Sequence, residues 1–174
     1  MFTADCLFNL GAFEQAVQQE AADHRKITVV LNFPQNPSGY TISEKEADGI
    51  VRILTETAAA GTYVMAVTDD AYFGLFYEPE TLKESLFARL CGAHPGILAV
   101  KLDGATKENY VWGLRVGFIT YGGAFSGDAA PLFDALERKT AGCIRGTISN
   151  ASHLSQTILL NSMQNENNPA ETKA

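Results

Sequence analysis

Four short apolar segments, spaced along the chain with helical patterns between them, constrain its fold more than any other feature. They comprise residues 27–32, 63–68, 97–102 and 116–121. The first three are nearly continuous runs of apolar, often β-branched residues, as in parallel strands that are covered on both faces. We therefore predict four strands, the first three of them in a parallel sheet.

Helical periodicity precedes and separates these strands. Apolar residues recur at positions 13, 16, 17 and 21 before the first strand, and at 50, 51, 53, 54 and 58 before the second. Ser43, with Glu46 three residues later, predicts a capping box at the start of the second helix. Residues 82–90 and 132–138 are predicted to form two further helices. The alternation of strands and helices predicts a layered α/β domain.

The composition argues against several kinds of partner. A net charge of −7 over 174 residues disfavours a nucleic-acid-binding surface, which needs clustered Lys and Arg. No apolar run approaches the ~20 residues that span a bilayer, and the first residues lack the pattern of a signal peptide. The three cysteines show no Cys-x-x-Cys spacing and the three histidines are scattered, so no metal site is expected. We expect a cytoplasmic protein that binds neither nucleic acid nor membrane.

Polar motifs follow the predicted strands. Asn36 lies in Asn-Pro-Ser-Gly after the first strand, and the second strand runs into Asp-Asp-Ala-Tyr, which begins at Asp69. Lys107 closes Asp-Gly-Ala-Thr-Lys after the third strand, and Arg115 follows eight residues later in Gly-Leu-Arg-Val-Gly. Because open α/β sheets bind ligands at the carboxyl ends of their strands, we expect these side chains to meet at one edge of the sheet.

Each motif also has a plain structural interpretation when it is taken alone. Asn-Pro-x-Gly is a common turn, and a strand-end aspartate such as Asp69 often caps the turn that follows. Asp70 is expected to be solvated or to act as such a cap. A lysine in a loop is normally solvated without a further role. The combination of Lys107 with Arg115, whose planar guanidinium suits a phosphate, favours a functional site.

In this order, the four motifs resemble those of the class I/II aminotransferases, enzymes of the pyridoxal phosphate (PLP) family with the aspartate-aminotransferase fold, fold type I. The resemblance extends roughly over residues 8–163. It implies a three-layer α/β/α major domain with a mostly parallel sheet, reduced here to about four strands of which the last is antiparallel. On this basis residues 1–160 form a partial PLP-binding major domain. The polar residues 161–174 form a tail that leads to a missing interdomain helix.

The resemblance also implies a role for each motif. Lys107 would form a Schiff base with PLP and, once displaced by the substrate, act as the general base. Asp69 would pair with the pyridine nitrogen of the cofactor, while Asn36 and Tyr72 would contact its phenolic oxygen. Arg115 would bind the phosphate. These roles make Lys107 the predicted catalytic residue.

Two further positions follow from the same resemblance. Many relatives carry Ser three residues before the lysine, where this chain has Gly104, and Thr106 offers a nearby hydroxyl for the phosphate instead. The segment 144–150 resembles one that presents an arginine at the dimer interface. Arg145 would then reach the partner's active site and bind the distal carboxylate of a dicarboxylate substrate. The alternative is a surface arginine that precedes a helix.

The resemblance implies an enzyme that transfers an amino group between an amino acid and a 2-oxo acid, and that forms a homodimer. Relatives are about twice this length and have two domains, which is more than the usual size of one domain. The chain is therefore expected to be a fragment of the major domain, inactive by itself. Two alternatives stay open. One is a decarboxylase or lyase of the same fold, and the other is a non-catalytic module for ligand sensing or dimerisation.

Overall fold

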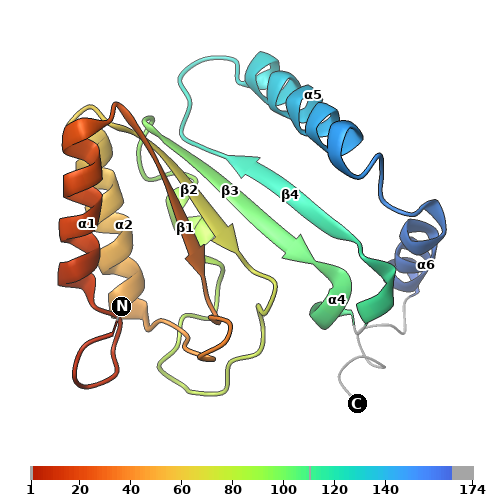
Figure 1. The fold of residues 1–174 in the computed structure, drawn as a ribbon, viewed down its shortest axis with the longest axis horizontal. Coiled ribbons are helices and arrows are strands. Elements are labelled where there is room, and N and C mark those ends of the chain that lie inside the picture. The colour runs from red at the N-terminus through yellow and green to blue at the C-terminus, as the bar shows by residue number, and fades with distance from the viewer. Residues whose placement is uncertain (1, 110, 166–174) are drawn as a thin grey trace.

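A single four-stranded sheet organises the molecule. The computed structural model describes residues 2–109 and 111–165. Strands β1 (Lys26–Asn32), β2 (Tyr63–Asp69), β3 (Ile97–Gly104) and β4 (Gly117–Gly122) lie side by side in that order (Figure 1). β1, β2 and β3 are parallel, and β4 is antiparallel to β3. The α/β class, the four strands and the antiparallel last strand are confirmed.

Three helices cover one face of this sheet. They are α1 (Leu10–Asp23), α2 (Glu44–Ala59) and α3 (Leu86–Leu90). Alternate residues of each strand point at them, because successive side chains of a strand face opposite sides. The buried residues of this core include Val17, Ile50, Ile53, Leu54, Leu86 and Leu90 on the helices and Ile27, Leu31, Val64, Ala66, Ile97 and Ala99 on the strands.

The opposite face of the sheet is only partly covered. Burial alternates along β1 and β2, and Val30 is 67% exposed on the uncovered side. Tyr63, which is paired with Lys26 at the start of the two strands, is 58% exposed. The apolar runs predict cover on both faces, whereas the described residues cover one.

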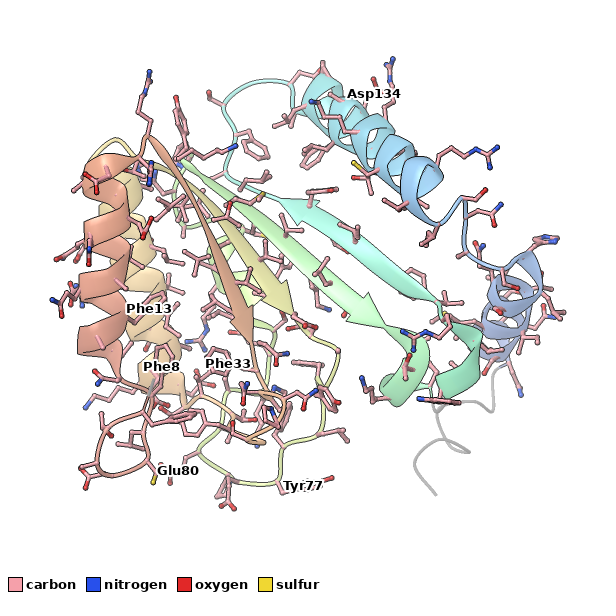
Figure 2. The ribbon with its side chains drawn as sticks, viewed as in Figure 1. Phe8, Phe13, Phe33, Tyr77, Glu80 and Asp134 are labelled. Atoms are coloured by element: carbon pink, nitrogen blue, oxygen red, sulfur yellow. The ribbon has the colours of Figure 1, made fainter. Side chains whose placement is uncertain are left out.

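The segment before α1 is fixed to the start of α2. Ser43 and Glu46 form the predicted capping box, in which the Ser43 backbone N–H donates to the Glu46 carboxylate at 2.7 Å. The backbone N–H of Phe8 donates to the same carboxylate at 2.9 Å. Figure 2 shows Phe8 with Phe13 and Phe33 at the lower end of α1 and β1, with ring centroids 5.6 and 5.7 Å from that of Phe8. This cluster closes one end of the core.

The third predicted helix is shorter than the sequence pattern indicates. Residues 82–90 were expected to be helical, but α3 begins only after Ser85, whose side chain caps its first turn. Leu82 donates its backbone N–H to the Ile42 carbonyl at 2.9 Å instead. This contact with the segment before α2 holds residues 82–85 outside the helix.

Helix α5 (Ala130–Thr147) is longer than the predicted 132–138 and buries none of its residues. It is joined to β4 by a hydrogen bond of 2.6 Å between the hydroxyls of Tyr121 and Thr140. Among the described residues, α5 therefore adds little cover to the sheet.

Two short helices, α4 (Ala105–Glu108) and the 3₁₀ helix η1 (Trp112–Leu114), follow β3. Helix α6 (His153–Gln164) was not predicted, and it packs against this region through Leu159, which is 2% exposed and clusters with Val116. It continues into the segment expected to be a polar tail. Most of that tail lies outside the described residues.

Candidate active site

The carboxyl ends of the three parallel strands lie at the same edge of the sheet. In the register of the sheet Asn32 at the end of β1 is paired with Asp69 at the end of β2, and Asp69 with Leu102 near the end of β3. Figure 1 shows β1, β2 and β3 directed toward this edge, with α4 directly after β3. The three motifs that follow these strands are therefore brought to one side of the molecule, as predicted.

Lys107, Thr106 and Arg115 line one open cavity of about 260 Å³. Gly104 and Gly117 contribute backbone to its wall. Residues that carry a primary amine, a hydroxyl and a guanidinium thus line a common space that is open to solvent, together with Asp103. This set of donors suits a phosphorylated aldehyde, because the guanidinium and hydroxyl can hold a phosphate while the amine reacts with the carbonyl.

Local backbone geometry brings Arg115 to this cavity. Arg115 ends η1 in the left-handed region, with φ 53°, which is uncommon for a residue other than glycine. The Ala105 backbone N–H donates to the Val116 carbonyl at 3.1 Å, which joins the start of α4 to the residue after Arg115. A Cβ atom on Gly117 would lie 2.9 Å from the Asp103 carbonyl oxygen, so only glycine allows this approach of β4 to β3.

Tyr72 reaches the same place from the end of β2. The Lys107 Nζ atom lies 4.1 Å from the centroid of the Tyr72 ring, in the range of a cation–π contact. Both side chains are half-buried. The second and third motifs, separated by more than thirty residues in sequence, therefore meet at the amine.

Asn36 and Asp69 are joined through a residue that the sequence did not single out. Asn32 donates its side-chain amide N–H to the Asp69 carbonyl at 3.0 Å and accepts the Asn36 backbone N–H at 2.9 Å. The Asp69 carboxylate itself accepts the Ala71 backbone N–H at 3.1 Å, which orients it at the tip of the strand. The sequence offered one signal for Asn32, namely that it is a polar residue at the end of an apolar strand. The hydrogen bond of its amide to Asp69 depends on the register of β1 and β2 and could not be read from the sequence.

Asp70, which the sequence suggested to be solvated or to cap a turn, is buried, with 8% of its surface exposed. Its carboxylate lies 3.7 Å from the Lys101 ammonium on β3, which is itself 2.8 Å from the Asp103 carboxylate. Burial raises the pKa of Asp70, and the Ser85 hydroxyl and Lys101 only partly oppose this effect. The tips of β2 and β3 are thus joined by a partly shielded charge cluster.

An Asp70→Asn substitution is expected to change how stability depends on pH. Because folding raises the pKa of Asp70, the folded state binds this proton more tightly than the unfolded state. The resulting stabilisation is fully present below the unfolded pKa and is lost as the pH rises through the folded pKa. The variant should therefore gain stability relative to the wild type over this pH rise, by about 1.4 kcal/mol for each unit by which the pKa is raised. Urea unfolding at a series of pH values measures the stability of the variant relative to the wild type. A stability difference that stays constant with pH would contradict the prediction.

Arg145 lies apart from the cavity. It occupies the last turn of α5, is exposed, and donates to the Ser149 hydroxyl. Among the described residues that line the cavity of Lys107, Arg145 does not occur. The predicted residues thus form two groups. Thr106, Arg115 and Tyr72 lie around Lys107, and Asn36 is connected to Asp69 through Asn32. Arg145 lies outside both groups.

Across residues 2–109 and 111–165, no helix is long and apolar enough to cross a membrane. The same residues contain no group of His, Cys, Asp and Glu side chains arranged to hold a metal ion.

Comparison with known proteins identifies the family. The family model described as "Aminotransferase class I and II" matches residues 3–173. The chain belongs to the class I and II aminotransferases. A solved aminotransferase from Anaerococcus prevotii superposes with a TM-score of 0.85 at 24% identity, over 99% of this chain and 41% of that one. This similarity shows that the fold is that of the family.

Two further relatives agree with this assignment. An aromatic-amino-acid aminotransferase from Burkholderia pseudomallei, solved covalently bound to pyridoxal phosphate, gives a TM-score of 0.64 at 20% identity, over 94% of this chain and 38% of that one. The Bacillus subtilis protein named "Probable N-acetyl-LL-diaminopimelate aminotransferase" is 29% identical over 91 residues, which are 52% of this chain and 20% of that protein. The chain thus spans about two fifths of the length of the solved relatives.

Proposed function

We propose that this chain provides the cofactor-binding part of a PLP-dependent aminotransferase that moves an amino group between an amino acid and a 2-oxo acid. The observation that carries the proposal is the shared cavity of Lys107, Thr106 and Arg115, with the Tyr72 ring 4.1 Å from the lysine amine. Membership of the aminotransferase family supports it, as does the PLP bound covalently to the Burkholderia pseudomallei relative.

The residues at the edge of the sheet fit the chemical groups of PLP. Arg115 and Thr106 would hold the phosphate through a guanidinium and a hydroxyl, and Lys107 would supply the primary amine for covalent attachment to the aldehyde. The Asp69 carboxylate, held by the Ala71 N–H, suits the protonated pyridine nitrogen. Asn36 and Tyr72 supply the polar groups for the phenolic oxygen.

Bound PLP would supply an electron sink that stabilises negative charge on the α-carbon of the substrate. Asp69 would keep the ring nitrogen protonated, which strengthens this effect. Lys107 would also carry the proton between the α-carbon of the substrate and the cofactor, a transfer that depends on its fixed position. Arg115 would hold the phosphate and keep the cofactor in the site.

The proposal extends to the assembly that the family resemblance implies. We propose a cytoplasmic homodimer in which Arg145, exposed at the end of α5, reaches the partner's site and binds a distal carboxylate. Residues 1–160 would be part of the larger domain, and residues 161–174 would lead toward the interdomain helix. The activity is proposed for a protein that supplies the rest of the fold, and we expect no turnover from the 174-residue chain alone.

Cofactor binding and product analysis test the proposal. The intact protein is titrated with PLP and followed by visible absorbance, then incubated with a panel of amino acids and a 2-oxo acid. We expect a visible band and the formation of a new 2-oxo acid with a new amino acid. An amine or an elimination product would identify a decarboxylase or lyase instead. A band without turnover of any substrate would favour the sensing or dimerisation module, and the absence of a band would refute PLP binding.

A further inference from the structure

We propose that Asn32 is a positioning residue that sets the separation of Asn36 and Asp69, and with it the fit of the cofactor ring. The inference rests on the proposed function, because it assigns to Asn32 a role in holding two residues proposed to contact PLP. Asn32 itself lies at the end of β1 and is half-buried.

The side-chain amide of Asn32 bonds in two directions at once. Its nitrogen donates to the Asp69 carbonyl at 3.0 Å, and its oxygen accepts the Asn36 backbone N–H at 2.9 Å. A carboxylate of the same size could accept but not donate, and an aliphatic side chain could do neither. Among the residues of this length, an amide alone can make both bonds.

The register of the sheet makes this connection possible. Asn32 is paired with Asp69 across β1 and β2, so its side chain stands beside the strand tip that carries the Asp69 carboxylate. The chain then turns back, with the Gln35 N–H donating to the Tyr40 carbonyl at 2.8 Å. Within the described part of the chain, the amide of Asn32 makes the one hydrogen-bonded link from Asn36 to the end of β2.

The chemistry of the cofactor makes this link consequential. The pyridine nitrogen and the phenolic oxygen are fixed relative to each other by a rigid aromatic ring. Asp69 and Asn36 must therefore be held at a matching separation, and a displacement of about 1 Å in a positioned group can cost ~10²-fold in rate. The loop that carries Asn36 is exposed, so a bond to the rigid end of β1 limits its movement.

Substitutions of Asn32 in the intact protein test the proposal against a matched control. Asn32→Asp keeps the size and the acceptor for Asn36 but turns a carboxylate oxygen toward the Asp69 carbonyl, and Asn32→Ala removes both bonds. Thr28→Ala is the control, because Thr28 is exposed on the same face of the same strand. The readouts are the PLP dissociation constant and the pH titration of the visible absorbance of the bound cofactor.

We expect Asn32→Ala and Asn32→Asp to weaken PLP binding about tenfold or more and to shift the absorbance titration, while Thr28→Ala leaves both unchanged. Because Asn32 acts through Asn36, its removal should have a smaller effect in an Asn36→Ala background. Comparing the effect of Asn32→Ala in the two backgrounds separates a positioning role from a general loss of stability, because a folding defect would weaken PLP binding in the double variant as well. Equal binding and equal titration in the Asn32 variants and the control would overturn the inference. A wild-type protein that binds no PLP would overturn the proposed function, and the inference with it.

Discussion

Replacing Lys107 with arginine is expected to abolish covalent attachment of PLP and to lower transamination by the intact protein about 10³-fold or more. Arginine keeps the positive charge beside Tyr72 but has no primary amine to bond to an aldehyde, and it does not release a proton at neutral pH. The variant therefore removes the nucleophile and the general base in one step. Borohydride reduction of the PLP complex, followed by peptide mass mapping, measures the attachment.

The control for this experiment is Lys83→Arg. Lys83 is exposed in the segment after β2, where it donates to the Glu78 carbonyl at 2.6 Å, outside the proposed site. The control should retain the full label on Lys107 and ordinary turnover. A label on any other lysine of the wild type, or an undiminished label in Lys107→Arg, would end the assignment of Lys107.

The sequence predicted the parts of the site that depend on chain order and residue type. Apolar runs marked the strands, and because parallel strands end at one edge, the side chains of the motifs were expected to meet there. The structure brings the lysine amine to 4.1 Å from the Tyr72 ring. What favoured this result was the strand topology, which places the ends of β2 and β3 next to each other.

Features that depend on register or on neighbouring strands were beyond the sequence pattern. Asn32 ends a strand like many polar residues. Its two partners, the Asp69 carbonyl and the Asn36 N–H, depend on the pairing with β2 and on the turn after β1. Asp70 was expected to be solvated or to cap a turn, but Lys101 on the adjacent strand lies 3.7 Å away and the residue is buried. Helix α6 was missed because few of its side chains face the protein; Leu159 is buried, whereas Leu154 and Leu160 are exposed.

Glu46 stabilises the loop that carries Asn36 from the opposite side. Its buried carboxylate accepts hydrogen bonds from the Tyr40 hydroxyl at 2.6 Å, from the Phe8 N–H at 2.9 Å and from the Ser43 N–H at 2.7 Å. Burial and the bond to Glu46 raise the pKa of Tyr40 to about 12. Glu46→Ala should lower the free energy of unfolding by about 3 kcal/mol, the sum of a lost helix cap and lost bonds to a charged group. Urea denaturation at neutral pH measures this change.

The pH dependence of the same variant distinguishes the buried carboxylate from ordinary helix propensity. Burial alone would raise the pKa of Glu46, but the hydrogen bonds from Tyr40, Ser43 and Phe8 outweigh this effect and hold the pKa below its ordinary value. The stabilisation is therefore present above the unfolded pKa and is lost as the pH falls through the folded pKa, so the wild type and Glu46→Ala should converge in acid. Glu44→Ala, in the same turn but exposed, should cost less than about 1 kcal/mol. A loss in Glu44→Ala as large as that in Glu46→Ala would show that helix charge, rather than this buried network, holds the start of α2.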